Sequence, residues 1–142
     1  MSARAKQPQL FPLALLLFSV GGVNFGADTG QVLGTAAHQG EGGPQEPPPV
    51  WFHKAVEFAR SPAYVEPTAL LVKPRGRAAC RVIIDAMQEI VEVDADEIKP
   101  FPAVLEPFAR RRGLWGVYPR AGRMFFLVDL ERLADTQRAG LN

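Results

Sequence analysis

Apolar runs separated by turn residues give this chain a pattern that occurs three times. Each copy consists of an apolar run, a short turn that contains glycine, a second apolar run and then an aspartate. Proline fixes φ in such turns and glycine readily adopts a positive φ, so the turn chemistry is typical of hairpins. The pattern predicts β-hairpins with turns at Gly21-Gly22, Lys73-Pro-Arg-Gly76 and Pro119-Arg-Ala-Gly122.

Two of the apolar runs are nearly continuous rather than alternating, namely Leu13–Val20 and Arg123–Val128. A strand with one solvent-exposed face alternates between apolar and polar residues, whereas a strand covered on both faces is apolar along most of its length. We therefore expect both runs to be strands inside the sheet, and Leu114–Tyr118 to pair with the second of them.

An aspartate follows the second strand of each predicted hairpin, at Asp28, Asp85 and Asp129. A side chain in this position accepts hydrogen bonds from the first free N–H groups of a helix. We therefore interpret the three aspartates as helix caps rather than as catalytic carboxylates.

The middle of the chain is dominated by glycine and proline over residues 39–49, which predicts a flexible loop. Val50–Ala59 follows and is compatible with a short amphipathic helix or with an extended segment. Its aromatic residues Trp51, Phe52 and Phe58 have two interpretations: they fill a gap in the core, or they face a partner protein.

The segment between the second and third hairpins contains shorter signals. Ile90–Val93 alternates like a strand, and the residues after it predict a turn and an extended connection. Residues 104–112 predict one or two helical turns, with Leu105 and Phe108 directed inward and Arg110-Arg-Arg112 directed outward. These arginines are either a solvated helix end or a patch that faces a partner.

The length and net charge of the chain limit the classes of protein to which it can belong. A chain of 142 residues is expected to form one domain, here residues 13–142 after a tail of residues 1–12. The hydrophobic fraction of 47% and the charged fraction of 22% are ordinary for a globular protein. A net charge of +1 supplies no general attraction to nucleic acid or to an anionic membrane. We expect neither as a partner, and no membrane insertion.

The first residues have a second interpretation, as a signal peptide. Arg4 and Lys6 precede the apolar run Leu10–Val20, and small residues follow at Gly26-Ala27. This order is typical of an export signal, here over residues 1–27. Cleavage there would delete a hairpin whose pattern recurs later in the chain, so we favour retention. An exported small β-protein stays as the alternative.

Residue types that carry catalysis or bind metals do not form a recognisable set. Cys80, the one cysteine, lies in a strand pattern, where a buried thiol is inert. His38 and His53 have neither a nucleophile partner nor the spacing of zinc ligands. Residues 94–97 lack the glycine and the distal glutamate of a calcium loop. We expect no catalytic residue, no cofactor and no metal, and therefore a protein that is not an enzyme.

Several segments follow one another in an order that is similar to a known family. The second half contains, in this order, Val82–Asp85, Ile90-Val-Glu-Val93, Ile98-Lys-Pro-Phe-Pro102, Leu114-Trp-Gly-Val117 and Gly122–Leu133. The opening hairpin, with Leu16–Asp28 and then Gln31-Val-Leu33, fits the same order. These segments resemble the CheW-like domains, which are scaffold domains of bacterial chemosensory arrays.

The resemblance implies a fold and a function. The fold is mainly β with short helices, in two small intertwined five-stranded β-barrels of SH3-like type. The implied function is that of a cytoplasmic, non-enzymatic adaptor that binds a histidine kinase regulatory domain, a chemoreceptor cytoplasmic tip, or both. No cofactor is implied.

The chain departs from the family in its centre. The family's central Leu-Arg-Gly segment has no counterpart, and Trp115 stands where the family often has arginine. The residues with which the family grips its partners are therefore not carried over. The candidate protein-binding residues of this chain are Trp51, Phe52, Phe58, Arg110, Arg111, Arg112 and Trp115.

Overall fold

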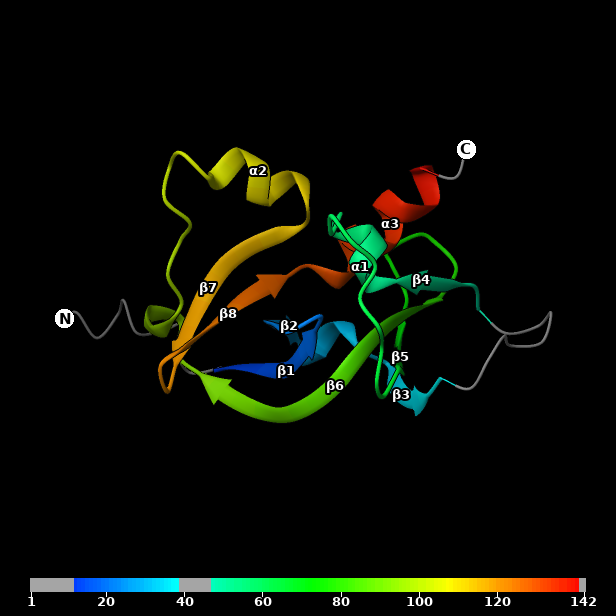
Figure 1. Cartoon of the computed structure of the whole chain (residues 1–142), viewed down its shortest axis with the longest axis horizontal. Helices are drawn as coiled ribbons and strands as arrows, with labels where there is room; N and C mark the ends of the chain where they lie inside the picture. The colour runs from blue at the N-terminus through cyan, green and yellow to red at the C-terminus, as the bar shows by residue number, and fades with distance from the viewer. Residues whose placement is uncertain (1–11, 39–46, 141–142) are drawn as a thin grey trace.

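The computed structural model describes residues 12–38 and 47–140, with side chains as far as Asp135. The strands are β1 (Leu13–Val20), β2 (Val23–Asp28), β3 (Gly34–Ala37), β4 (Pro49–Trp51), β5 (Thr68–Val72), β6 (Cys80–Val93), β7 (Leu114–Arg120) and β8 (Arg123–Val128). The helices are α1 (Phe52–Ala55), α2 (Glu106–Arg111) and α3 (Leu130–Gly140), with 3₁₀ turns η2 (Thr29–Gln31) and η3 (Ala95–Glu97). The prediction of a mainly β fold with short helices is confirmed (Figure 1).

The long strand β6 belongs to both halves of the molecule. Its first part pairs with β5 and β4, and its second part pairs with β1. The strand order is β3-β5-β6-β1-β2-β8-β7, with β4 joined to β6 outside this path. In Figure 1, β6 runs from the lower left toward β4, with β1, β2, β7 and β8 toward the left of the view and β3, β4 and β5 toward the right.

The half that contains β7 is strongly curled. In its strand order β6 and β7 are at opposite ends. Nevertheless the Arg120 guanidinium of β7 lies 3.1 Å from the Glu89 carboxylate of β6. Because a flat sheet would keep its end strands apart, this ion pair indicates a curled sheet. Closure into two five-stranded barrels stays a prediction.

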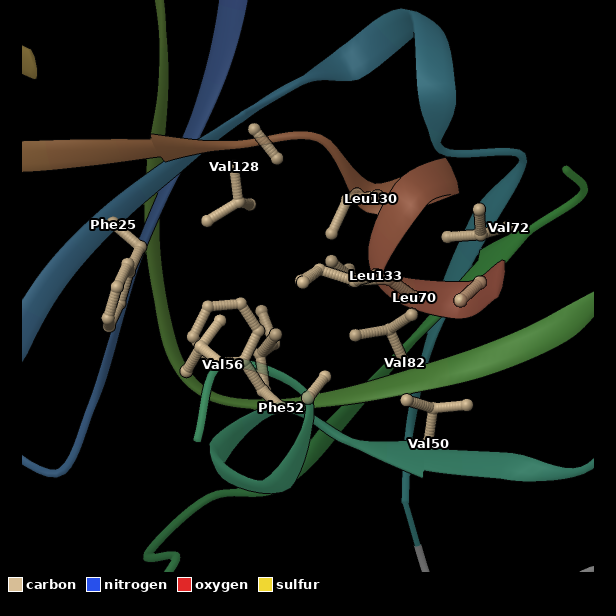
Figure 2. Packing of buried hydrophobic residues seen from close by; sticks show 14 of the residues in the cluster. Phe25, Val50, Phe52, Val56, Leu70, Val72, Val82, Val128, Leu130 and Leu133 are labelled. Atoms are coloured by element: carbon tan, nitrogen blue, oxygen red, sulfur yellow. The ribbon is translucent and has the colours of Figure 1, made fainter. Parts of the chain in front are cut away.

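Strand β1 separates two hydrophobic cores, because its side chains alternate between the two faces of the sheet. Leu15 and Leu17 enter the smaller core, and Leu16 and Phe18 enter the larger one. Figure 2 shows the larger core, in which side chains from β4, β5, β6, β8, α1 and α3 meet. The expectation that Leu13–Val20 is a strand covered on both faces is confirmed.

The three predicted hairpins are present as antiparallel pairs, β1 with β2, β5 with β6, and β7 with β8. The last turn is tighter than predicted, since Pro119 still pairs with Met124 inside the ladder. The turn residues Ala121 and Gly122 both adopt positive φ, 51° and 77°. A two-residue turn with positive φ at both positions matches the right-handed twist of the two strands that it joins.

Two of the three aspartates cap helical turns, as predicted. Asp28 accepts a hydrogen bond from the Gly30 N–H at the start of η2. Asp129 accepts from the Arg132 N–H in the first turn of α3. Gln31 completes this second cap, because its amide donates to Asp129 and its oxygen accepts from the Leu130 N–H.

The prediction for Asp85 is wrong, because no helix starts there. Strand β6 continues through this position to Val93. The Asp85 carboxylate is buried and accepts hydrogen bonds from the N–H groups of Val65 and Glu66. The next residue, Ala86, has a φ of 29°, and the register between β1 and β6 shifts nearby. An irregular strand therefore replaces the expected helix, and Asp85 fixes a loop instead of a helix end.

Asp129 and Asp85 are expected to respond differently to substitution by asparagine. Asp129→Asn should change the free energy of unfolding by less than about 0.5 kcal/mol, because asparagine caps as well as aspartate. Asp85→Asn should cost about 1–3 kcal/mol, because it replaces one carboxylate oxygen with an N–H₂ donor beside the N–H groups of Val65 and Glu66 and removes the negative charge that strengthens these hydrogen bonds. Urea unfolding of both variants measures the difference, and equal effects would contradict these roles.

Residues 1–11 and 39–46 lie outside the described part of the chain, so the predicted tail and most of the predicted flexible loop are not assessed. Val50–Ala59 combines its two predicted forms, because strand β4 leads directly into the single turn of α1. Among the described helices, none has the length and apolar character that crossing a membrane requires.

Candidate protein-interaction surface

Helix α2 presents apolar side chains to the solvent. Ala109 is its buried residue, and the helix is followed directly by β7. Val104, Leu105 and Phe108 are 75%, 50% and 51% exposed. The prediction that Leu105 and Phe108 point inward is therefore wrong. A helix of six residues that docks through one alanine cannot bury them.

A sharp turn joins α2 to β7 and places the next exposed residue. Gly113 has a φ of 77°, and a Cβ atom there would lie 2.8 Å from Leu133 Cδ2, so any other residue would be strained. The register between β7 and β8 then shifts between Leu114 and Gly116. Trp115 lies at this irregularity and is 44% exposed.

A pocket of about 280 Å³ opens beside Trp115. It is formed by the connection before α2, by α2 itself, by the start of β7 and by the first turn of α3. The lining residues are Pro100, Phe101, Glu106, Arg110, Gly113, Leu114, Trp115, Asp129 and Arg132. We call this pocket, together with Val104, Leu105 and Phe108, the α2 surface.

The three arginines of the predicted patch, Arg110-Arg-Arg112, contact different parts of the molecule. Arg110 forms an ion pair with Glu106 one turn earlier and lines the pocket. The Arg111 guanidinium lies 5.4 Å above the centre of the Phe108 ring. Arg112 instead lies 3.7 Å from Glu57, in the segment that follows α1. The structure therefore brings Arg110 and Trp115 to one pocket, whereas Arg111 and Arg112 have their contacts elsewhere.

The aromatic residues around α1 lie in different environments. Phe52 is fully buried and meets Phe18 and Phe25 edge-on, with ring centres 5.2 and 4.7 Å apart (Figure 2). Phe58 is partly buried against the same core. Trp51 is partly exposed and lies edge-on to Tyr64, 5.0 Å away. Phe52 thus occupies a core position, whereas Trp51 and Phe58 are both partly exposed.

A hydrogen-bonded pair lies next to Trp51. The Tyr64 hydroxyl lies 2.9 Å from His53 Nδ1 and accepts a hydrogen bond from the His53 N–H. Burial raises the pKa of Tyr64 to about 12 and lowers the pKa of His53. Both side chains are therefore uncharged at neutral pH, and the pair connects α1 to the loop that Asp85 fixes.

Sequence patterns did not reveal part of the α2 surface. Pro100, Phe101, Val104 and Arg132 were not candidates, although the apolar residues in an aperiodic stretch at 100–105 were a usable signal. Among the described residues, no three His, Cys, Asp or Glu side chains lie close enough to hold a metal ion. What the α2 surface offers chemically is apolar contact and guanidinium donors.

Comparison with known proteins finds a similarity in structure but not in sequence. No family model matches the sequence, and no curated protein matches it. Among solved structures, the scaffolding protein TtCheW from Thermoanaerobacter tengcongensis aligns with a TM-score of 0.70. The alignment covers 86% of this chain and 87% of TtCheW, at 17% sequence identity. The chain has a CheW-like fold. The resemblance of the segment order to the CheW-like domains therefore agrees with the three-dimensional structure.

Proposed function

We propose that this protein is a cytoplasmic, non-enzymatic adaptor of a bacterial chemosensory system, which couples a receptor to a histidine kinase through protein contacts. The observation that carries the proposal is the CheW-like fold, shared with a scaffolding protein over nearly the full length of both chains. Fold alone does not assign function, so the surface has to supply a suitable site.

The α2 surface supports an adaptor role. Aromatic residues and arginine are enriched at protein interfaces, and large exposed apolar side chains that lie together mark such sites. Trp115 and Arg110 meet this description, because both line the same pocket and Trp115 is 44% exposed. Cys80 and His53, whose residue types often carry catalysis, are not available at an accessible site, since Cys80 is buried and His53 is hydrogen-bonded to Tyr64.

The alternative, an exported protein that loses residues 1–27, conflicts with the position of β1. Removal of these residues would delete β1 and nearly all of β2. β1 supplies the fully buried Leu15, Leu17 and Phe18 to both cores. Intact mass of the protein isolated from its own cells distinguishes the two, and a mass short of residues 1–27 would support export.

Affinity capture with the tagged full chain tests the proposal. We expect a chemoreceptor and a histidine kinase among the proteins recovered, identified by mass spectrometry. Trp115→Ala should lower their recovery, with an affinity loss of about thirtyfold, because a tryptophan anchor contributes about 2 kcal/mol or more. Met124→Ala, which truncates another exposed apolar side chain, is the matched control and should leave recovery unchanged.

The melting temperature of each variant must equal that of the parent for this comparison to hold. Equal recovery by Trp115→Ala and the parent would contradict the assignment of the α2 surface. Recovery of neither a receptor nor a kinase by the parent would contradict the adaptor function itself.

A further inference from the structure

We propose that the pocket of the α2 surface binds an acidic segment of the partner protein, with an apolar side chain against Trp115 and a neighbouring carboxylate on Arg132 and Arg110. The proposal rests on the proposed adaptor function, since it names the chemistry of the partner at that same surface. It follows from the apolar wall of the pocket, from its free guanidinium donors and from the way its own carboxylates are used.

Internal contacts hold the apolar wall of the pocket in place. Pro100, Phe101, Leu114 and Trp115 supply it. The Phe101 ring stacks on Phe126 with planes 8° apart and centres 6.2 Å apart. Lys99 and Val117 exchange backbone hydrogen bonds of 2.8 Å, which fix the connection to β7. A preformed wall of this kind suits one leucine or phenylalanine side chain of a ligand.

The two carboxylates of the pocket are engaged by the protein itself. Glu106 is paired with Arg110. Asp129 Oδ1 accepts hydrogen bonds from the Gln31 amide at 2.9 Å and from the Arg132 N–H at 3.2 Å. One oxygen of each carboxylate, Glu106 Oε2 and Asp129 Oδ1, is therefore already in an internal contact, which reduces the attraction of the pocket for a cationic ligand.

The guanidinium groups, in contrast, retain unused donors. Within the described part of the chain, no carboxylate lies within 4.0 Å of the Arg132 or Arg111 guanidinium nitrogens. Arg110 uses one of its five N–H donors on Glu106. Arg110 and Arg132 line the pocket, whereas Arg111 lies over the Phe108 ring. This arrangement complements a ligand that carries negative charge next to an apolar anchor.

Titration of the ¹⁵N-labelled full chain with short synthetic peptides tests the proposal. One peptide carries a Leu-Phe pair between glutamates, a second has glutamine in place of each glutamate, and a third has lysine. Trp115 lines the pocket and Trp51, the other tryptophan, does not, so their two indole N–H signals give an internal control. We expect the acidic peptide to shift the Trp115 signal alone and to bind about tenfold more tightly than the glutamine peptide.

Substitution of Arg132 measures how much its positive charge contributes to binding of the acidic peptide. Arg132→Gln should weaken binding of the acidic peptide about two- to fivefold and leave the glutamine peptide unaffected. Arg123→Gln removes the same charge from an exposed position on β8 that does not line the pocket, and it should have no effect. Binding of the acidic peptide should also weaken as salt is raised.

Several outcomes would overturn the proposal: no peptide binds, the three peptides bind equally, the lysine peptide binds best, or the Trp115 signal stays in place. If capture of a receptor and a kinase by the parent chain succeeds while the peptide test fails, the adaptor function stands and only the acidic character of the partner segment is wrong. A second copy of this chain as the occupant would appear as concentration-dependent shifts of Trp115 without peptide, which would also overturn it.

Discussion

Phe18→Asp is expected to abolish cooperative folding. Phe18 is fully buried in β1, and its ring meets Phe25 and Phe52 in the larger core. An aspartate there would bury a carboxylate without a partner, which costs several kcal/mol beyond the lost apolar contacts. A domain of this size is stable by only about 5–15 kcal/mol. Circular dichroism during a thermal scan should show no cooperative transition for the variant.

Met124→Asp is the matched control for this experiment. It introduces the same carboxylate into strand β8, at a side chain that is 53% exposed. Surface substitutions of this kind usually change stability by no more than about 0.5 kcal/mol. A Phe18→Asp protein that melts like the Met124→Asp protein would show that β1 is not a core strand, and would revive the signal-peptide interpretation of residues 1–27.

Phe52→Ala is expected to lower the free energy of unfolding by about 3–5 kcal/mol, which is the usual range for a buried phenylalanine. The side chain is fully buried and lies among residues from β1, β2 and α1 (Figure 2). Trp51→Ala should cost clearly less, since Trp51 is partly exposed beside Tyr64. Urea unfolding of the two variants gives both values, and a larger loss for Trp51→Ala would reverse the assignment of core and surface in this segment.

Hairpins and caps were predictable because their signals are local. Each turn is specified by a few neighbouring residues, such as Gly122 with its positive φ. Asp28 and Asp129 cap helical turns through N–H groups two or three residues away. The continuous apolar run Leu13–Val20 likewise predicts a strand covered on both faces, because burial on two sides leaves no polar positions.

Asp85 was not predictable because its partners are distant in sequence. Its carboxylate accepts from the N–H groups of Val65 and Glu66, about twenty residues earlier. An apolar strand followed by an aspartate looks the same in the sequence whether a helix begins there or the strand continues. The pairing of β6 with β1 decides between the two, and that pairing is a property of the whole sheet.

The candidate site was predicted in part. Arg110 and Trp115 were both candidates, and they line one pocket, because α2 and β7 are joined by a short turn. The exposure of Leu105 and Phe108 was missed, since helical periodicity shows which residues share a face but not whether another element covers that face. Arg132 comes from α3, and only the tertiary structure brings it to the pocket.

Co-sedimentation with receptor-containing membranes tests the adaptor function most directly. Membranes that hold the chemoreceptor recovered by affinity capture are mixed with the purified histidine kinase, with and without the full chain, and centrifuged. We predict that the kinase sediments with the membranes when the chain is present, and that Trp115→Ala loses this effect while Met124→Ala keeps it. Sedimentation of the kinase to the same extent with and without the chain would contradict the adaptor function.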